Sequence, residues 1–122
     1  MKRTILVVDD DPQFTTFVDR TLKRAGFSVV TANDGCDVPD ILSNTRVDLL
    51  LLDLQMPAMD GFSVMEGLKT NEADSYLPVI VLTAQPGHKL RALQAGARDF
   101  ISKPFDLVEV KTRIRNMLEV RL

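Results

Sequence analysis

Four consecutive leucines, Leu49 to Leu52, constrain the fold of this chain more than any other stretch. The run has no polar alternation, which is typical of a strand buried on both faces, and such strands belong to parallel sheets covered by helices. The run ends at Asp53, and Met56-Pro57 and Asp60-Gly61 beyond it are loop and turn signals. We therefore expect Asp53 at the carboxyl end of a central strand, where open α/β sheets place their ligand crevices.

The length and composition of the chain indicate one folded domain. Residues 1–122 are predicted to form a single domain with one core. Hydrophobic residues make up 45% and charged residues 26%, which is typical of a globular protein and not of a disordered or fibrous one. The net charge of −2 argues against a surface that binds nucleic acid through its phosphates, so we expect no direct nucleic-acid binding.

Nothing in the sequence requires an oxidising compartment or a membrane. The single cysteine, Cys36, cannot form an internal disulfide. The apolar run near the N-terminus lasts only about five residues and ends in acids, which is too short for a signal or membrane helix. A cytoplasmic protein without membrane contact is the expectation.

Hydrophobic periodicity predicts five strands that alternate with five helices. The strands are expected at residues 5–8, 27–31, 47–53, 78–83 and 99–102. The first helix is predicted over residues 12–25, the third over 61–68, the fourth over 87–95, and the fifth after Asp106 as its N-cap. This order, with short loops, defines a doubly wound α/β fold with a parallel sheet and right-handed crossovers.

Local signals refine these helices. Asp11 followed by Pro12 is a strong helix start, and Gly26 is expected to end the first helix. The second helix is expected to begin late, with Asp37 as its cap, or to be distorted, because Pro39 lacks a backbone donor. The residues expected on the inner face of the first helix are Phe14, Phe17, Val18, Thr21 and Leu22.

Polar residues end four of the predicted strands: Asp9 and Asp10, Asp53, Thr83 and Lys103. All four strand ends open on one edge of a parallel sheet, so these residues are expected to meet in one crevice. Two carboxylates about 4 Å apart repel by roughly 4 kcal/mol at an effective dielectric near 20, so a cation must bind there. Because no His or Cys accompanies the acids, we expect a hard cation, Mg²⁺ or Mn²⁺, with oxygen ligands.

The same crevice has the groups that phosphoryl transfer requires. A metal-bound aspartate is a nucleophile toward phosphorus in enzymes that form aspartyl phosphates, and Asp53 is expected to act in this way. Lys103 and Thr83 could contact the remaining oxygens of the phosphoryl group. The residues therefore predict chemistry on phosphorus, with Asp53 as the acceptor.

The complete set of motifs resembles the receiver domain of two-component response regulators. The resemblance covers essentially the whole chain and is carried by Val7-Val8-Asp9-Asp10, Asp53 with Met56-Pro57 and Asp60-Gly61, Leu82-Thr83-Ala84, Ala95-Gly96-Ala97 and Lys103-Pro104-Phe105. It implies a phosphorelay switch in which Asp53 accepts a phosphoryl group from a sensor histidine kinase or a histidine phosphotransfer protein. By the same resemblance, the domain catalyses only its own phosphorylation and dephosphorylation and is not otherwise an enzyme.

The resemblance also implies roles for single residues. Asp10, Asp53 and the backbone carbonyl of Gln55 would ligate Mg²⁺, with Asp9 holding a metal-bound water. Thr83 and Phe100 would form the switch, in which the hydroxyl moves toward phosphate and the aromatic ring follows.

For the fold, the resemblance implies a flavodoxin-like sandwich with strand order 2-1-3-4-5 and a cis Lys103-Pro104 bond. The output surface would be the fourth helix, fifth strand and fifth helix, which could also form a homodimer.

Each singled-out residue also has a structural explanation. The acids with Lys103 could form a buried ion-pair network, and Thr83 could be a strand-end hydroxyl bonded to backbone. Phe100 could simply pack in the core. His88, the single histidine, is expected to be a solvated side chain at the start of the fourth helix.

Three other functions compete with the phosphorelay switch. A haloacid-dehalogenase-like aspartyl phosphatase needs a second aspartate two residues after the nucleophile, where this chain has Gln55. A flavin-binding module needs a phosphate loop after the first strand, where three acids would repel the phosphate. A docking module that is independent of phosphorylation would not need the complete residue set.

The C-terminal third of the chain is rich in basic residues, which could form either a solvated face or a docking surface. The helix periodicity of the fifth helix persists to Leu118, which suggests that the chain is the N-terminal receiver of a longer protein.

Overall fold

The computed structural model describes residues 2–54, 61–70, 77–85 and 87–119 of the chain. Five strands form one sheet: β1 (Thr4–Val8), β2 (Ser28–Ala32), β3 (Leu49–Asp53), β4 (Val79–Thr83) and β5 (Asp99–Ser102). The helices are α1 (Pro12–Arg24), the 3₁₀ turn η1 (Gly35–Asp37), α2 (Val38–Asn44), α3 (Gly61–Thr70), α4 (His88–Gln94) and α5 (Leu107–Leu118). All strand pairs are parallel, in the order β2-β1-β3-β4-β5. The predicted flavodoxin-like architecture and strand order are confirmed.

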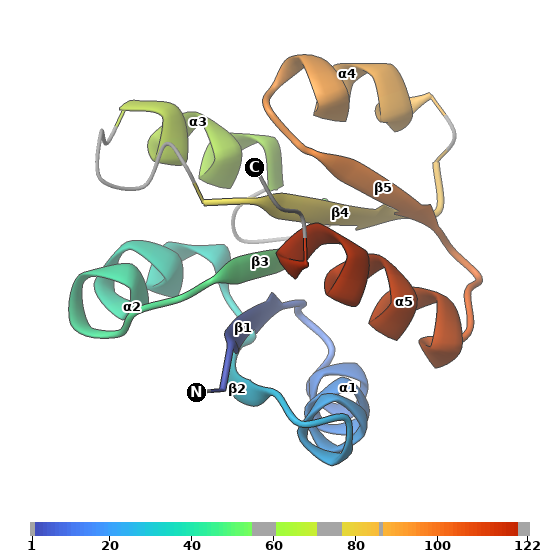
Figure 1. The fold of residues 1–122 in the computed structure, drawn as a ribbon. Helices are drawn as coiled ribbons and strands as arrows, with labels where there is room; N and C mark the ends of the chain where they lie inside the picture. Colours follow the sequence, from blue (N-terminus) through green and yellow to red (C-terminus); the bar gives the residue numbers. More distant parts are fainter. Residues whose placement is uncertain (1, 55–60, 71–76, 86, 120–122) are drawn as a thin grey trace.

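Helices cover the sheet on both faces and make a three-layer sandwich. Figure 1 shows α1 and α5 on one face and α2, α3 and α4 on the other. Side chains alternate between these layers along each strand, since Leu50 and Leu52 pack in the α3 layer and Leu49 and Leu51 in the layer of α1 and α5. All four leucines are fully buried, as the unbroken apolar run predicts.

The helix ends follow the predicted local signals. Asp11 is the N-cap of α1, and its carboxylate accepts a hydrogen bond from the backbone N–H of Gln13 at 3.0 Å. Asp106 caps α5 in the same way, by accepting from the N–H of Glu109 at 2.8 Å. Gly26, just beyond α1, has a φ of 99°, a left-handed conformation that other residues rarely adopt. The Lys103-Pro104 bond is cis, as predicted.

The inner face of α1 differs from the prediction at two positions. Phe17 is 60% exposed, whereas Thr15, which was not expected inside, is 3% exposed. The buried stripe runs through Thr15, Val18 and Leu22, and Phe17 lies one residue outside it. Thr15 is accommodated there because its hydroxyl donates to the carbonyl of Pro12 at 3.1 Å.

The second helix is distorted at its start, as Pro39 predicts. The chain first makes the 3₁₀ turn η1, which is capped by Asp34 through a hydrogen bond from the N–H of Cys36 at 2.8 Å. Asp37 occupies the N-cap position of α2 but makes no side-chain cap bond with the described residues. Pro39 lies in the first turn of α2, where an α-helix needs no backbone donor.

The described helices are all too short or too polar to cross a lipid bilayer.

Candidate functional site

Three carboxylates meet at the carboxyl edge of the sheet. Strands β1 and β3 pair with Val8 opposite Leu52, so Asp9 and Asp10, which follow β1, lie beside Asp53 at the end of β3. One oxygen from each acid can be chosen so that all three lie within 4.8 Å of one another. Asp9 and Asp53 are buried, whereas Asp10 is exposed at the mouth of the site. The predicted convergence of these acids is confirmed.

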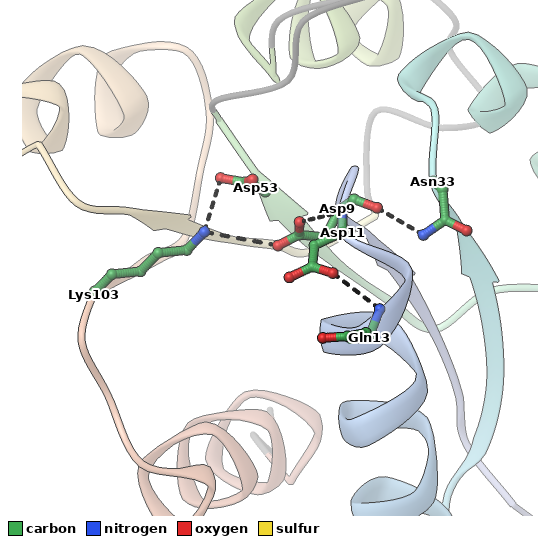
Figure 2. A network of polar contacts seen from close by, with 6 residues as sticks. All are labelled: Asp9, Asp11, Gln13, Asn33, Asp53 and Lys103. Carbon is green, nitrogen blue, oxygen red and sulfur yellow. Dashed lines mark hydrogen bonds and ion pairs between the residues drawn. The ribbon is translucent and has the colours of Figure 1, made fainter.

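Lys103 supplies a positive charge to this cluster. Its backbone N–H donates to the carbonyl of Thr83 at 2.9 Å, which fixes the start of the loop after β5. Its ammonium nitrogen lies 3.4 Å from Oδ1 of Asp53 and 3.7 Å from Oδ2 of Asp9, as Figure 2 shows. A single lysine therefore bridges acids from the first and third strands, and it brings residues from the beginning, middle and end of the chain together.

A hydrogen-bonded loop holds Asp9 in place. The backbone N–H of Asp11 donates to Oδ1 of Asp9 at 3.0 Å. The side-chain amide of Asn33 donates to the backbone carbonyl of Asp9 at 2.9 Å (Figure 2). The same amide donates to the hydroxyl of Thr15 at 3.1 Å. Asn33 was predicted only as a turn residue. The signal that could have identified it is the β1–β2 register, which sets Val8 opposite Ala32 and so places Asn33 beside Asp9.

Burial changes the acidity of Asp9. Desolvation raises the pKa of the Asp9 carboxyl from its usual 3.8 to about 6, because the charged form loses contact with water. The N–H of Asp11 and the ammonium of Lys103 lower this pKa, while Asp53 and Asp10 raise it. Three ionised carboxylates against the one ammonium of Lys103 leave the cluster negative, so the site favours an additional cation.

The donor set fits a hard divalent cation. It consists of carboxylate oxygens, with no imidazole or thiolate among the described residues of the cluster. Such ligands suit Mg²⁺ or Mn²⁺, and the exposed position of Asp10 leaves one side of the cluster open to water, which Mg²⁺ usually retains. The backbone carbonyl of Gln55, predicted as a further ligand, lies outside the described residues.

Thr83 ends β4 with its side chain fully buried. Its hydroxyl oxygen accepts a hydrogen bond from the backbone N–H of Gln85 at 3.0 Å and lies 3.3 Å from Nδ1 of His88. The prediction of a solvated His88 is wrong: the imidazole is half-buried and meets the Phe62 ring edge to face, with ring centroids 5.5 Å apart. The prediction failed because α4 begins at His88, close enough to the end of β4 for the imidazole to reach the Thr83 hydroxyl.

Phe100, the second predicted switch residue, is half-buried in β5. Its ring packs against the core cluster beneath α3 and α4. It also lines a groove between α4, β5 and α5, together with Lys89, Leu93 and Arg113. A partly exposed aromatic at this position is compatible both with a moving ring and with plain packing.

The fold and this site define a signalling receiver, and comparison with known proteins agrees. A family model described as the response regulator receiver domain matches residues 5–115. The chain therefore belongs to the receiver-domain family of two-component response regulators.

Its relatives are full-length regulators. The chain is 38% identical over 116 residues to the DNA-binding dual master transcriptional regulator RpaA of Synechocystis sp., covering 93% of this chain and 48% of that protein. It is 40% identical over 120 residues to response regulator MprA of Mycobacterium bovis, covering 97% of this chain and 51% of that protein. The chain thus spans about half the length of the curated relatives it matches.

Solved structures show the same fold. The chemotaxis response regulator CheY4 of Vibrio cholerae superposes with a TM-score of 0.90 at 28% identity, covering 97% of this chain and 100% of that one. The signal receiver domain of a response regulator from Bermanella marisrubri gives a TM-score of 0.89 at 33% identity, covering 98% of this chain and 100% of that one. Receiver domains generally bind Mg²⁺ at an acidic pocket, and the aspartate cluster has that composition.

Proposed function

We propose that this receiver domain, residues 1–122, is a phosphorylation-activated switch that accepts a phosphoryl group on Asp53 in a Mg²⁺-dependent reaction. The observation that carries the proposal is the contact of the Lys103 ammonium with both Asp53 and Asp9 beside a three-carboxylate cluster. A buried acid with an adjacent cation and an open, solvent-facing side is suited to attack an incoming phosphorus atom.

The chemistry requires little of the protein. An oxygen of Asp53 attacks the phosphorus of a phosphohistidine, the new O–P bond forms as the P–N bond breaks, and the imidazole leaves with the electron pair. Asp53 reacts as a carboxylate, so no base is needed. Lys103 and Thr83 stabilise the charge on the transferring oxygens. A divalent cation held by Asp10 and Asp53 supplies further positive charge to those oxygens when bound, with Asp9 orienting water beside it.

The partners and the output follow from the family. A sensor histidine kinase or a histidine phosphotransfer protein is the phosphoryl donor. Thr83 and Phe100 carry the change to the surface of α4, β5 and α5, which presents basic residues and is the face for a downstream partner or a homodimer. Catalysis is limited to phosphorylation and dephosphorylation of the domain itself.

Intact-mass spectrometry tests the proposal. Incubation with acetyl phosphate and Mg²⁺ is expected to add one acid-stable, base-labile phosphoryl group, and Asp53→Asn or a chelator is expected to abolish the addition. Asp40→Asn, which changes an exposed acid on α2, is the matched control and should be labelled normally. Labelling of Asp53→Asn would identify a different acceptor, and an unlabelled wild type would favour a phosphorylation-independent docking module.

A further inference from the structure

His88 contacts the hydroxyl that the proposed switch must move. It is the first residue of α4, and its backbone N–H donates to the carbonyl of Gln85 at 3.1 Å. Its Nδ1 lies 3.3 Å from the hydroxyl oxygen of Thr83. This distance is within hydrogen-bond range, so the orientation of the buried hydroxyl is linked to the imidazole.

The donors and acceptors around the Thr83 hydroxyl limit how it can bond to His88. A threonine hydroxyl has one proton to donate and two lone pairs that accept. The N–H of Gln85 takes one lone pair, and a backbone N–H cannot accept the proton. Among the described partners of Thr83, the imidazole is the group that can accept this proton, and Nδ1 accepts it in the tautomer that carries the ring proton on Nε2. In that tautomer the resting hydroxyl donates to His88.

The imidazole is held in the position that this bond requires. Its ring meets Phe62 nearly perpendicularly, at an interplanar angle of 85°. Phe62 is only 8% exposed, and the guanidinium of Arg91 lies 3.8 Å from the centroid of its ring. Packing from α3 and from the next turn of α4 thus restricts the rotation of the histidine ring. The acceptor atom is consequently preorganised and is not simply a surface group that the hydroxyl meets by chance.

We infer that His88 is a positioning residue that holds the Thr83 hydroxyl in its resting orientation and competes with the phosphoryl group for its single proton. The inference rests on the proposed function, in which Thr83 donates to a phosphoryl oxygen after Asp53 is phosphorylated. The two acceptors cannot share one proton, so the bond to His88 must break for the switch to move. The strength of this bond helps set how readily the phosphorylated form is reached.

Nuclear magnetic resonance can observe the bond directly, because the chain has one histidine and its ring signals need no assignment. In the resting protein, the ¹⁵N spectrum is expected to show Nδ1 as a hydrogen-bonded acceptor and Nε2 as protonated. Thr83→Val, which removes the hydroxyl with little change of volume, should shift Nδ1 toward the value of an unbonded acceptor. Beryllofluoride with Mg²⁺, a stable mimic of the phosphoryl group, should produce the same shift in the wild type.

Two substitutions separate hydrogen bonding from packing. His88→Phe keeps an aromatic ring against Phe62 but removes the acceptor, whereas His88→Asn keeps an acceptor near the position of Nδ1. We expect His88→Phe to bind beryllofluoride about fivefold more tightly than wild type, the factor to which one buried hydrogen bond corresponds. His88→Asn is expected to remain near the wild-type affinity. In a Thr83→Val background, His88→Phe is expected to have no effect.

The outcomes distinguish this inference from the proposed function. If the wild type binds beryllofluoride but its Nδ1 signal does not move, or if His88→Phe and His88→Asn have equal affinities, the inference is overturned while the proposed function stands. If Nδ1 of the resting protein is not hydrogen-bonded, the inference fails whatever the protein does with phosphate. If the wild type takes up neither beryllofluoride nor a phosphoryl group, both fail together.

Discussion

Burial disfavours the ionised form of Asp9 and raises the pKa of its carboxyl. The side chain is buried next to Asp53, and the raised pKa shows that the folded protein holds a proton on Asp9 more tightly than the unfolded chain does. A divalent cation bound beside Asp9 would offset the same negative charge that this proton neutralises. The unfavourable charge of Asp9 is thus what makes the site receptive to a divalent ion.

The pH dependence of stability is predicted from this shift. Because the folded pKa of Asp9 is about 6 and the unfolded value is 3.8, the folded state binds more protons between pH 4 and 6. The free energy of unfolding should therefore fall as the pH rises through this window, and the full benefit is present only below pH 4. The expected loss is about 2 kcal/mol, less than the full shift implies, because water reaches the mouth of the site.

Urea denaturation between pH 4 and 8 in the presence of a chelator measures this loss. Asp9→Asn should remove the Asp9 contribution and be more stable than wild type above pH 6. Asp40→Asn, far from the site on α2, should follow the wild-type curve. An Asp9→Asn curve that parallels the wild type would show that Asp9 does not titrate in this range.

At the scale of elements, the ends of a strand are easier to predict from the sequence when both faces of the strand are buried. Strands β1, β3 and β4 are covered on both faces, so their apolar runs are unbroken and their ends are marked by the first polar residue. The acids and Thr83 were predicted because they stand at those ends, and Lys103 was predicted because it follows the short strand β5. The edge strand β2 is only partly buried, and both its predicted start and its predicted end were one residue early, whereas the predicted ends of β3 and β4 match the structure.

Two site contacts could not be predicted because they depend on how turns fold in three dimensions. Asn33 contacts Asp9 only through the strand register, and His88 reaches Thr83 only because α4 begins immediately above the end of β4. Neither residue type carries a periodic signal. The prediction for Phe17 was wrong for a different reason: a spacing of three and four residues placed it on the inner face, whereas the helix buries the hydrogen-bonded Thr15 instead.

The start of α3 is predicted to depend on the absence of a side chain. A Cβ added to Gly61 would lie 2.7 Å from Cα of Leu54 and 2.9 Å from the backbone oxygen of Asp53. Gly61→Ala must therefore push the end of β3 away from α3, with an expected loss of about 2 kcal/mol of stability and slower phosphorylation of Asp53.

Gly67 is the matched control within the same helix, because a Cβ there meets nothing within 4 Å. Gly67→Ala is expected to gain roughly 0.5 kcal/mol, since alanine is the better helix former. Thermal unfolding and acetyl phosphate labelling of both variants provide the measurement. Equal stabilities would mean that the helix tolerates the displacement at Gly61.

At the scale of the whole molecule, ion pairs between one lysine and two aspartates connect the ends of β1, β3 and β5. Asp53 ends β3, whereas Asp9 and Lys103 directly follow β1 and β5, and β4 separates β3 from β5 within the sheet. Lys103 is the described cation that reaches across this gap to both buried acids. The lysine and a divalent ion therefore act on the same negative charges.

Removing this lysine is predicted to make stability depend on the divalent ion. Lys103→Met removes the ammonium, which lies 5.7 Å from the centroid of the Phe14 ring, and leaves the carboxylates without their cation. The variant should therefore lose roughly 2 kcal/mol of stability in chelator. Mg²⁺ should then stabilise Lys103→Met more than it stabilises the wild type, since it meets less competing positive charge.

Thermal unfolding with and without Mg²⁺ compares the two proteins, and Lys89→Met on the exposed face of α4 controls for the loss of a charge. The test compares the Mg²⁺-induced shift in Tm of Lys103→Met with that of the wild type. If that shift is the same in wild type and Lys103→Met, then lysine and Mg²⁺ do not share these carboxylates, and the acids must be neutralised by protons or by other groups. A larger shift in the variant would show that residues from three distant strands form a single electrostatic unit.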